Sequence, residues 1–181
     1  MVVAVLLISA TCLLVYAAVH DLAARTVPNW LPVCLVLLGL GVRLADHSLR
    51  SGLIVATVTF VALFIIWFSG LMGGGDVKLW AATVLLIPPH WQVEMSFFLR
   101  VLLIGGALAV LYLALWLPVS RRRAQTANVP AIVRARAQSL LQRIARAEVW
   151  RISRRGPLPY AVAISGSAIL TLLPLSMQNL R

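Results

Sequence analysis

Long apolar runs separated by short polar breaks dominate the chain. A hydrocarbon core about 30 Å thick is crossed by a helix of roughly 20 apolar residues, so each run is a candidate membrane span. The fourth run is short because Pro88 and Pro89 stop it, and we expect it to include the Gly-rich segment before it or to lie partly buried among its neighbours. The pattern predicts an all-α polytopic transmembrane bundle of about six helices, at residues 2–19, 30–45, 52–70, 77–89, 97–119 and 157–176.

The composition agrees with a bilayer as the solvent. Of the 181 residues, 61% are hydrophobic and 12% are charged, which excludes an ordinary soluble globular domain. The predicted spans leave little chain for anything else, so we expect a single membrane-embedded domain over residues 1–181. No Lys or Arg precedes the first apolar run, unlike in a secretory signal peptide, so residues 2–19 are predicted to remain as the first span.

The basic residues are distributed unevenly between the loops. Ten of the 16 Lys and Arg residues lie between Arg121 and Arg155. With about six spans, this segment falls on the same side as residues 20–29 and 70–78, each of which holds one basic residue. Cytoplasmic loops carry an excess of Lys and Arg, so we predict this side in the cytoplasm and both termini outside. The opposite side has far fewer basic residues, namely Arg43, Arg50, Arg100 and Arg181.

Residues 120–156 form the one sizeable polar segment. Its apolar positions recur at near-helical spacing, at Val133, Ala137, Leu141, Ala145, Val149 and Ile152. This predicts a basic amphipathic cytoplasmic helix between the last two spans, lying in the interface against anionic lipid headgroups. Arginine-rich stretches can also bind nucleic acid, but nothing else in the sequence supports such recognition, so no nucleic-acid partner is predicted.

Two cysteines, Cys12 and Cys34, lie inside apolar runs without a Cys-x-x-Cys or Cys/His spacing. This pattern predicts small packing residues rather than a zinc site or a disulfide. No metal-ligand constellation and no nucleotide-cradling Gly-rich turn is recognisable elsewhere, so we expect neither a metal nor a cofactor.

Only five acidic residues occur in the chain, and two of them stand at span ends. Asp21 closes the first predicted span and Asp76 opens the fourth, which places both at the cytoplasmic edge of the predicted bundle. Two carboxylates brought close together share one proton, so the ionised one can activate a water while the protonated one donates to an amide. Each Asp could instead simply mark a solvated helix end.

Three consecutive glycines, Gly73 to Gly75, precede Asp76. Such a run permits positive φ or a close approach of a neighbouring chain, at an entropic cost. Binding of an extended peptide substrate would be one reason for it. A hinge or a small-residue helix contact would be another.

Three segments together resemble a known family. Residues 72–79 (MGGGDVKL) are similar to the Gly-x-Gly-Asp motif of the type IV prepilin peptidases and their archaeal preflagellin relatives. Residues 21–29 (DLAARTVPN) resemble the first-aspartate segment of that family, an Asp followed by Arg and then Ile/Val-Pro-Asn. Residues 159–164 (PYAVAI) resemble the Pro-Tyr stretch that opens its last span. The three segments come in the family's order and cover nearly the full chain.

The resemblance implies a membrane aspartic endopeptidase: a helical bundle in the bacterial inner membrane with its active site facing the cytoplasm. By this likeness Asp21 and Asp76 take the two catalytic positions, and Gly73 and Gly75 are the motif glycines. The implied substrate is the basic leader of a prepilin or pseudopilin, cut before its hydrophobic helix. The pilus assembly machinery is a further implied partner.

The chain also departs from the larger members of the family. Those members carry an N-terminal portion with paired Cys-x-x-Cys motifs and methyltransferase activity, whereas the first predicted span here begins at residue 2. We therefore expect no N-terminal methyltransferase domain and no N-methylation. The short form resembles the prepilin peptidases of tight-adherence (Flp) pilus systems.

Several alternatives remain open from the sequence. Arg25 and Lys78 could bind the substrate or could be ordinary cytoplasmic anchors. Lys78 is two residues from Asp76 and points to another helix face, so no direct pair is expected. The whole chain could also be a small ion- or proton-coupled transporter subunit that uses the two aspartates, or a noncatalytic secretion-system scaffold that docks through its basic helix.

Overall fold

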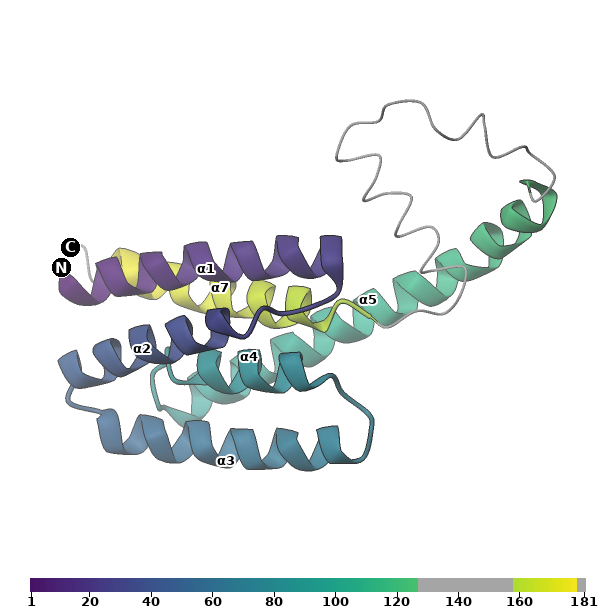
Figure 1. The fold of residues 1–181 in the computed structure, drawn as a ribbon. Coiled ribbons are helices and arrows are strands. Elements are labelled where there is room, and N and C mark those ends of the chain that lie inside the picture. The colour runs from purple at the N-terminus through teal and green to yellow at the C-terminus, as the bar shows by residue number, and fades with distance from the viewer. Residues whose placement is uncertain (127–157, 179–181) are drawn as a thin grey trace. The chain divides into compact units, whose positions relative to one another are not determined.

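The computed structural model describes residues 1–126 and 158–178, and all regular structure within these ranges is α-helical (Figure 1). The all-α prediction is therefore confirmed for this part of the chain. The described helices are α1 (Val2–Ala24), α2 (Trp30–Ala45), α3 (Leu49–Phe68), α4 (Gly74–Val84), α5 (Trp91–Thr126) and α7 (Tyr160–Gln178).

The chain forms two compact units, Met1–Gly105 with Tyr160–Arg181, and Gly106–Pro159. The first unit holds α1 to α4, α7 and the beginning of α5, and it contains both Asp21 and Asp76. The expectation of a single domain stays a prediction.

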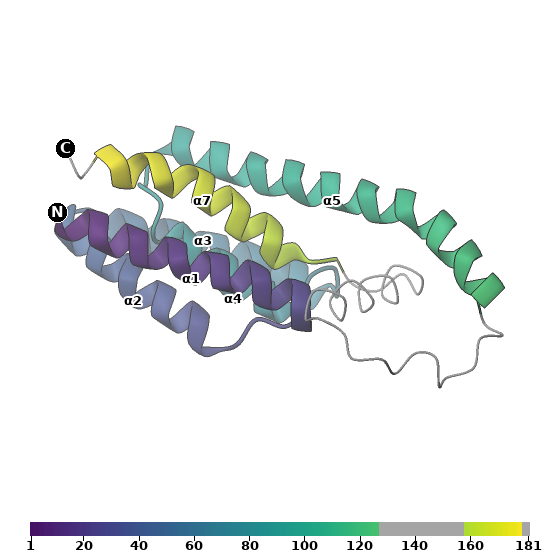
Figure 2. The same cartoon turned by 90° about the horizontal axis from the view of Figure 1, so that it is seen from above.

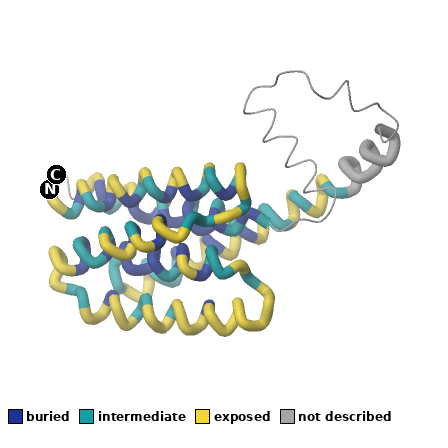
Figure 3. The backbone as a smooth tube through the Cα atoms, in the orientation of Figure 1, coloured by how far each residue is buried: buried dark blue, intermediate teal, exposed yellow. Residues whose placement is uncertain are grey.

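Four described helices are long and apolar enough to cross a membrane: α1, α3, α7 and the Trp91–Trp116 part of α5. The α2 helix is apolar but shorter, at 16 residues. Most of α3 is exposed, with only Gly52 and Leu63 buried along its length (Figure 3). An extended apolar surface of this kind suits contact with lipid. The chain is thus a membrane protein, while the exact number of spans stays a prediction.

One face of α1 is buried, and α1 lies alongside α7 (Figures 1 and 2). Its buried residues recur every three or four positions, which is the spacing of a single helix face; they are Ala4, Leu7, Ala10, Leu14, Ala17 and Asp21. The α7 helix buries small residues such as Ala161, Ala163 and Ala168, and small residues let helix backbones approach closely. Asp21 is the only charged residue among these buried residues of α1, and it is the last of them along the helix.

The fourth helix is shorter than the apolar run that predicted it. α4 begins at Gly74 and ends at Val84, so it is 11 residues long and about 16 Å at 1.5 Å per residue. After Val84 the backbone hydrogen bonds join residues three apart instead of four. The N–H groups of Leu86 and Ile87 donate to the carbonyls of Thr83 and Val84, both at 3.0 Å. Pro88 excludes further helix, because a proline disfavours the helical conformation of the residue before it. The α4 helix contacts α2, α3 and α7, and the residues that follow it, Leu85 to Ile87, are buried.

The α5 helix is longer than predicted at both ends. It begins at Trp91, where the His90 carbonyl accepts bonds from the N–H groups of Val93 and Glu94, both at 3.0 Å. Hydropathy missed this first turn because Gln92, Glu94 and Ser96 alternate with its apolar residues, although polar residues form helices readily. Its last residues, 120–126, belong to the basic segment, and the positions that predict the amphipathic helix, Val133 to Ile152, lie outside the described residues.

Candidate active site

Asp21 stands on the buried face of α1, one turn before the helix ends, and is 5% exposed. Its carbonyl accepts a 2.8 Å bond from the N–H of Arg25, which closes the helix. Arg25 adopts the left-handed conformation, with φ 56° and ψ 33°, and so turns the chain away from the helix axis. The carboxylate is therefore carried by a rigid element rather than by a loop.

The turn after α1 returns the chain to the bundle. His20 Nδ1 lies 2.8 Å from the Thr26 carbonyl, which ties the end of the helix to the turn. Pro28 and Asn29 then lead into α2 at Trp30. This turn places Val27 beside Gly75 and Asn29 beside Lys78.

Asp76 lies in the first turn of α4 and is half-buried. Gly73 precedes the helix in an extended conformation, with φ −73° and ψ 139°. Its carbonyl accepts the first helical bonds, from the N–H of Asp76 at 3.1 Å and from that of Val77 at 3.2 Å. The Asp76 carboxylate folds back over Gly73, since a Cβ built on Gly73 would lie 2.9 Å from Asp76 Oδ2. A side chain at position 73 would therefore push the carboxylate away.

The other two glycines of the run permit close approach rather than unusual dihedrals. Among the described glycines only Gly70 has positive φ, at 75°, so the run does not need left-handed backbone. A Cβ on Gly75 would meet Val27 Cβ at 3.3 Å, and one on Gly74 would meet the indole Nε1 of Trp67 at 3.1 Å. The run therefore serves the close approach of neighbouring side chains, and whether it also binds an extended peptide stays a prediction.

A polar contact joins the same two segments. The Lys78 ammonium donates to Asn29 Oδ1 over 3.3 Å, and both residues are exposed. The predicted lack of a direct pair between Lys78 and Asp76 stays a prediction. Arg25 lies just after α1 and is half-buried, while Lys78 is exposed in the first part of α4. Whether either residue binds substrate or serves as an anchor stays open.

The two carboxylates interact electrostatically. Asp76 lies outside the four helices that are long and apolar enough to span a membrane. The pKa of its carboxyl group is raised from 3.8 to about 7. Burial, which disfavours the charged form, contributes most, and the nearby Asp21 carboxylate adds to it. A carboxyl group with this pKa can hold a proton near neutral pH, which an ordinary aspartate does not.

The structure also describes several polar residues outside the two aspartate segments. Asp46 lies 3.4 Å from Arg43, at the far end of α2. Cys12 and Cys34 are free thiols. Within residues 1–126 and 158–178, no group of His, Cys, Asp and Glu could hold a metal ion. Tyr160 opens α7 and its ring lies 3.6 Å from a Cβ built on Gly105, which is a packing contact.

Comparison with known families settles the general identity. The sequence profile of the type IV leader peptidase family matches residues 8–117, more than half of the chain. The chain belongs to the type IV leader peptidase family. The matched range contains both aspartate segments, whereas the Pro159-Tyr160 segment lies beyond it. No curated protein and no solved structure matches the chain significantly.

Membership of the type IV leader peptidase family indicates a protease and agrees with the resemblance seen in the motifs. The sequence did not identify two neighbours of the site, Val27 and Trp67. A run of glycines indicates that something packs closely against it, but it does not identify the partner. In this peptidase one partner comes from the turn after α1 and the other from the end of α3.

Proposed function

We propose that this type IV leader peptidase is an aspartic endopeptidase whose catalytic residues are Asp21 and Asp76. The observation that carries the proposal is the electrostatic coupling of the two carboxylates, which come from segments far apart in the sequence. Both stand at helix ends, on elements whose packing fixes them. Coupling between two carboxyl groups is what shared-proton chemistry uses, and it supports the proposal.

The chemistry needs only the two carboxyl groups and a water. Coupled carboxylates titrate as a pair, and because burial and Asp21 raise the pKa of Asp76, we assign the shared proton to Asp76 in this proposal. In the first step, the Asp21 carboxylate accepts a proton from the water as its oxygen bonds to the scissile carbonyl carbon, and Asp76 donates its proton to the carbonyl oxygen. In the second step, the gem-diol returns a proton to Asp76, the amide nitrogen takes one from Asp21, and the C–N bond breaks. The pair is thereby restored to its starting protonation state.

The substrate in this proposal is the leader of a Flp-like prepilin or pseudopilin, cut at the cytoplasmic face of the inner membrane. The motif likeness supports the substrate class, and the arginine distribution supports the orientation. Lipid at the basic segment and the pilus assembly machinery belong to the same proposal. The alternative functions, a transporter subunit or a scaffold, do not explain why the glycine run packs against Val27 and Asp76.

The decisive experiment is cleavage of a synthetic prepilin leader peptide by the full chain, purified in detergent. The expected products are the free leader and a shortened peptide with a new α-amine, both identified by mass spectrometry. A scrambled leader of the same composition is the control substrate. Absence of cleavage by a correctly folded enzyme, across several prepilin leaders, would contradict the proposal.

A further inference from the structure

The end of α4 that lies away from Asp76 is buried in the protein. Leu85, Leu86 and Ile87 are at most 2% exposed, although the chain has left the helix there. The last carbonyls of a helix have no intrahelical partner, and an unsatisfied carbonyl in an apolar interior is costly. Non-helical backbone at membrane depth is tolerated where protein covers it and satisfies it. The Leu86 carbonyl needs such a partner.

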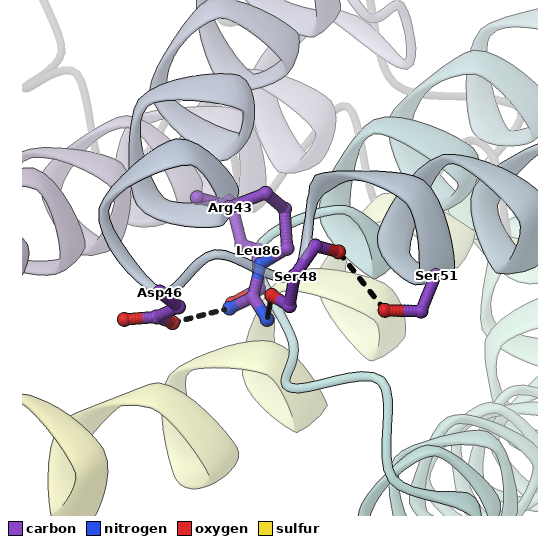
Figure 4. Close-up of polar contacts among 5 residues, drawn as sticks. All are labelled: Arg43, Asp46, Ser48, Ser51 and Leu86. Carbon is purple, nitrogen blue, oxygen red and sulfur yellow. Dashed lines mark hydrogen bonds and ion pairs between the residues drawn. The ribbon is translucent and has the colours of Figure 1, made fainter.

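Arg43, near the C-terminal end of α2, supplies it (Figure 4). Its guanidinium donates to the Leu86 carbonyl over 3.3 Å and to Ser48 Oγ over 3.1 Å. It also lies 3.4 Å from Asp46 Oδ2. Arg43 itself is only 2% exposed, so it is among the largest fully buried side chains of the described chain. A buried guanidinium with three oxygen partners is held in one position.

Glycines on two helices make room for this contact. A Cβ on Gly52 of α3 would lie 2.7 Å from Arg43 Cδ and 2.9 Å from its Cγ, closer than real atoms approach. A Cβ on Gly39 of α2 would lie 3.0 Å from Leu85 Cγ. The stem of Arg43 therefore passes against the backbone of α3 to reach the chain beyond α4. The side chain joins α2, α3 and α4 at one end of the bundle.

We propose that Arg43 is a positioning residue for the Asp21–Asp76 pair, because it anchors the end of α4 opposite to Asp76. This inference rests on the proposed peptidase function. The α4 helix is a single rigid segment, so a shift at its far end moves Asp76 along the helix axis relative to Asp21. The Gly75–Val27 contact tolerates little movement, because a Cβ at Gly75 would already lie 3.3 Å from Val27 Cβ. A displacement of about 1 Å at a reacting group can cost 100-fold in rate.

A purely local role for Arg43 makes different predictions. The backbone carbonyl of Arg43 accepts a 3.0 Å hydrogen bond from the N–H of Ser48, so Arg43 also belongs to the turn between α2 and α3. If only that turn mattered, substitution would lower the amount of folded enzyme and leave each folded molecule unchanged. If Arg43 positions α4, the turnover and the pH profile of the folded molecules change.

The first test measures leader cleavage by Arg43→Met, Arg43→Lys and Gly52→Ala, normalised to folded protein from size-exclusion chromatography. Arg43→Met keeps an apolar stem but has no donor for Leu86, and Gly52→Ala displaces the stem of the native arginine. In Arg43→Met and in Gly52→Ala we expect kcat to fall about 10- to 100-fold, with KM changed less. We also expect the alkaline limb of the pH profile of these two variants to move toward lower pH. Gly166→Ala is the matched control, since nothing lies within 4 Å of a Cβ at that glycine of α7.

Combining the two changes sharpens this test. Because Arg43→Met and Gly52→Ala break the same contact, the double variant should lose less activity than the product of the two single losses. Arg43→Lys should recover only part of the activity, since an ammonium lacks the planar fork of the guanidinium. Unchanged kcat and unchanged pH profile in the folded Arg43 and Gly52 variants would overturn the proposal.

The second test does not depend on catalysis. Asn29→Cys and Lys78→Cys are placed in a background with Cys12→Ser and Cys34→Ser, and a short bifunctional thiol reagent joins the two positions, whose native side chains lie 3.3 Å apart. Adding Arg43→Met should slow the cross-link several-fold, and adding Gly166→Ala should not. An equal rate with and without Arg43→Met would overturn the positioning role. If the cross-link responds to Arg43→Met but the wild-type enzyme cleaves no leader, the proposed function fails and the anchoring of α4 stands.

Discussion

The backbone of Gly75 lies directly against the side chain of Val27, so that a Cβ added to Gly75 would come within 3.3 Å of Val27 Cβ. This contact joins the segment that follows Asp21 to the segment that carries Asp76. The Lys78–Asn29 bond, at 3.3 Å, joins the same two segments. The two segments that carry the carboxylates are therefore joined by packing of their own motif residues.

Loss of either carboxylate should abolish leader cleavage. Asp21→Asn and Asp76→Asn each remove one member of the proton-sharing pair, so we expect activity to fall at least about 1000-fold while the protein still inserts at normal levels. Immunoblots of a co-expressed prepilin measure processing. Glu148→Gln, which removes an acid elsewhere in the sequence, should cleave normally. Substantial processing by either Asp variant would contradict the assignment, and a chelator should leave the wild-type rate unchanged.

Substitution of the motif glycines should reduce turnover by displacing the carboxylates. Gly75→Ala places a methyl group against Val27, and Gly73→Ala places one 2.9 Å from Asp76 Oδ2. We expect kcat to fall about 10- to 100-fold for Gly75→Ala and further for Gly73→Ala, because the latter moves the reacting group itself. Steady-state kinetics on a leader peptide measure the effect. Gly166→Ala again serves as the control, and equal activity in all three variants would rule out this role of the glycines.

The pH profile should have its alkaline limb near the raised pKa of Asp76. This group must be protonated to act as the acid, and its pKa of about 7 means that it loses the proton as the pH rises through that value. Activity should therefore decline above about pH 7. Infrared titration of the carboxylic C=O band should show the same midpoint in the absence of substrate. In Asp21→Asn the midpoint should drop yet remain above 3.8, because burial is the larger cause of the shift.

The same shift makes stability depend on pH. Asp76 binds its proton more tightly in the folded chain than at its ordinary pKa of 3.8, so the stability it contributes is complete below about pH 4 and is lost as the pH rises through about 7. Asp76→Asn removes this dependence. At pH 8 the variant should unfold at a higher temperature than wild type, by about 2–4 °C for each kcal/mol recovered. Thermal unfolding in detergent at pH 8 and pH 4 measures this, and a difference that does not shrink at pH 4 would contradict it.

The orientation in the membrane can be tested with reporter fusions. Fusions after Ser120 and near Gly156 should report the cytoplasm, and one after Asn179 should report the outside. The expectation follows from the excess of arginine between residues 121 and 155. A cytoplasmic C-terminus would mean that the number of spans is odd, with the segment around α4 as the first place to look.

The sequence by itself determined the helical membrane class and the two aspartate segments. Apolar runs must pair their backbone groups within themselves in a bilayer, so hydropathy alone predicts helices there. The ends of the helices were less certain: α4 ended at Val84, before Pro88, and α5 began at Trp91, ahead of the apolar run that predicted it. The two aspartate segments could be recognised because their residue types and spacing resemble those of a peptidase family.

The tertiary structure alone decided which residues meet. Asp21 could be assigned to the buried face of α1 only when α7 and the other helices were seen to cover that face. The sequence did not identify the partners of Val27, Trp67 and Arg43. Their contacts with Gly75, Gly74 and Leu86 arise from the packing of segments distant in the chain. Hydrophobic periodicity reports which face of a helix is buried but not its partner, because the same apolar stripe can pack against many others.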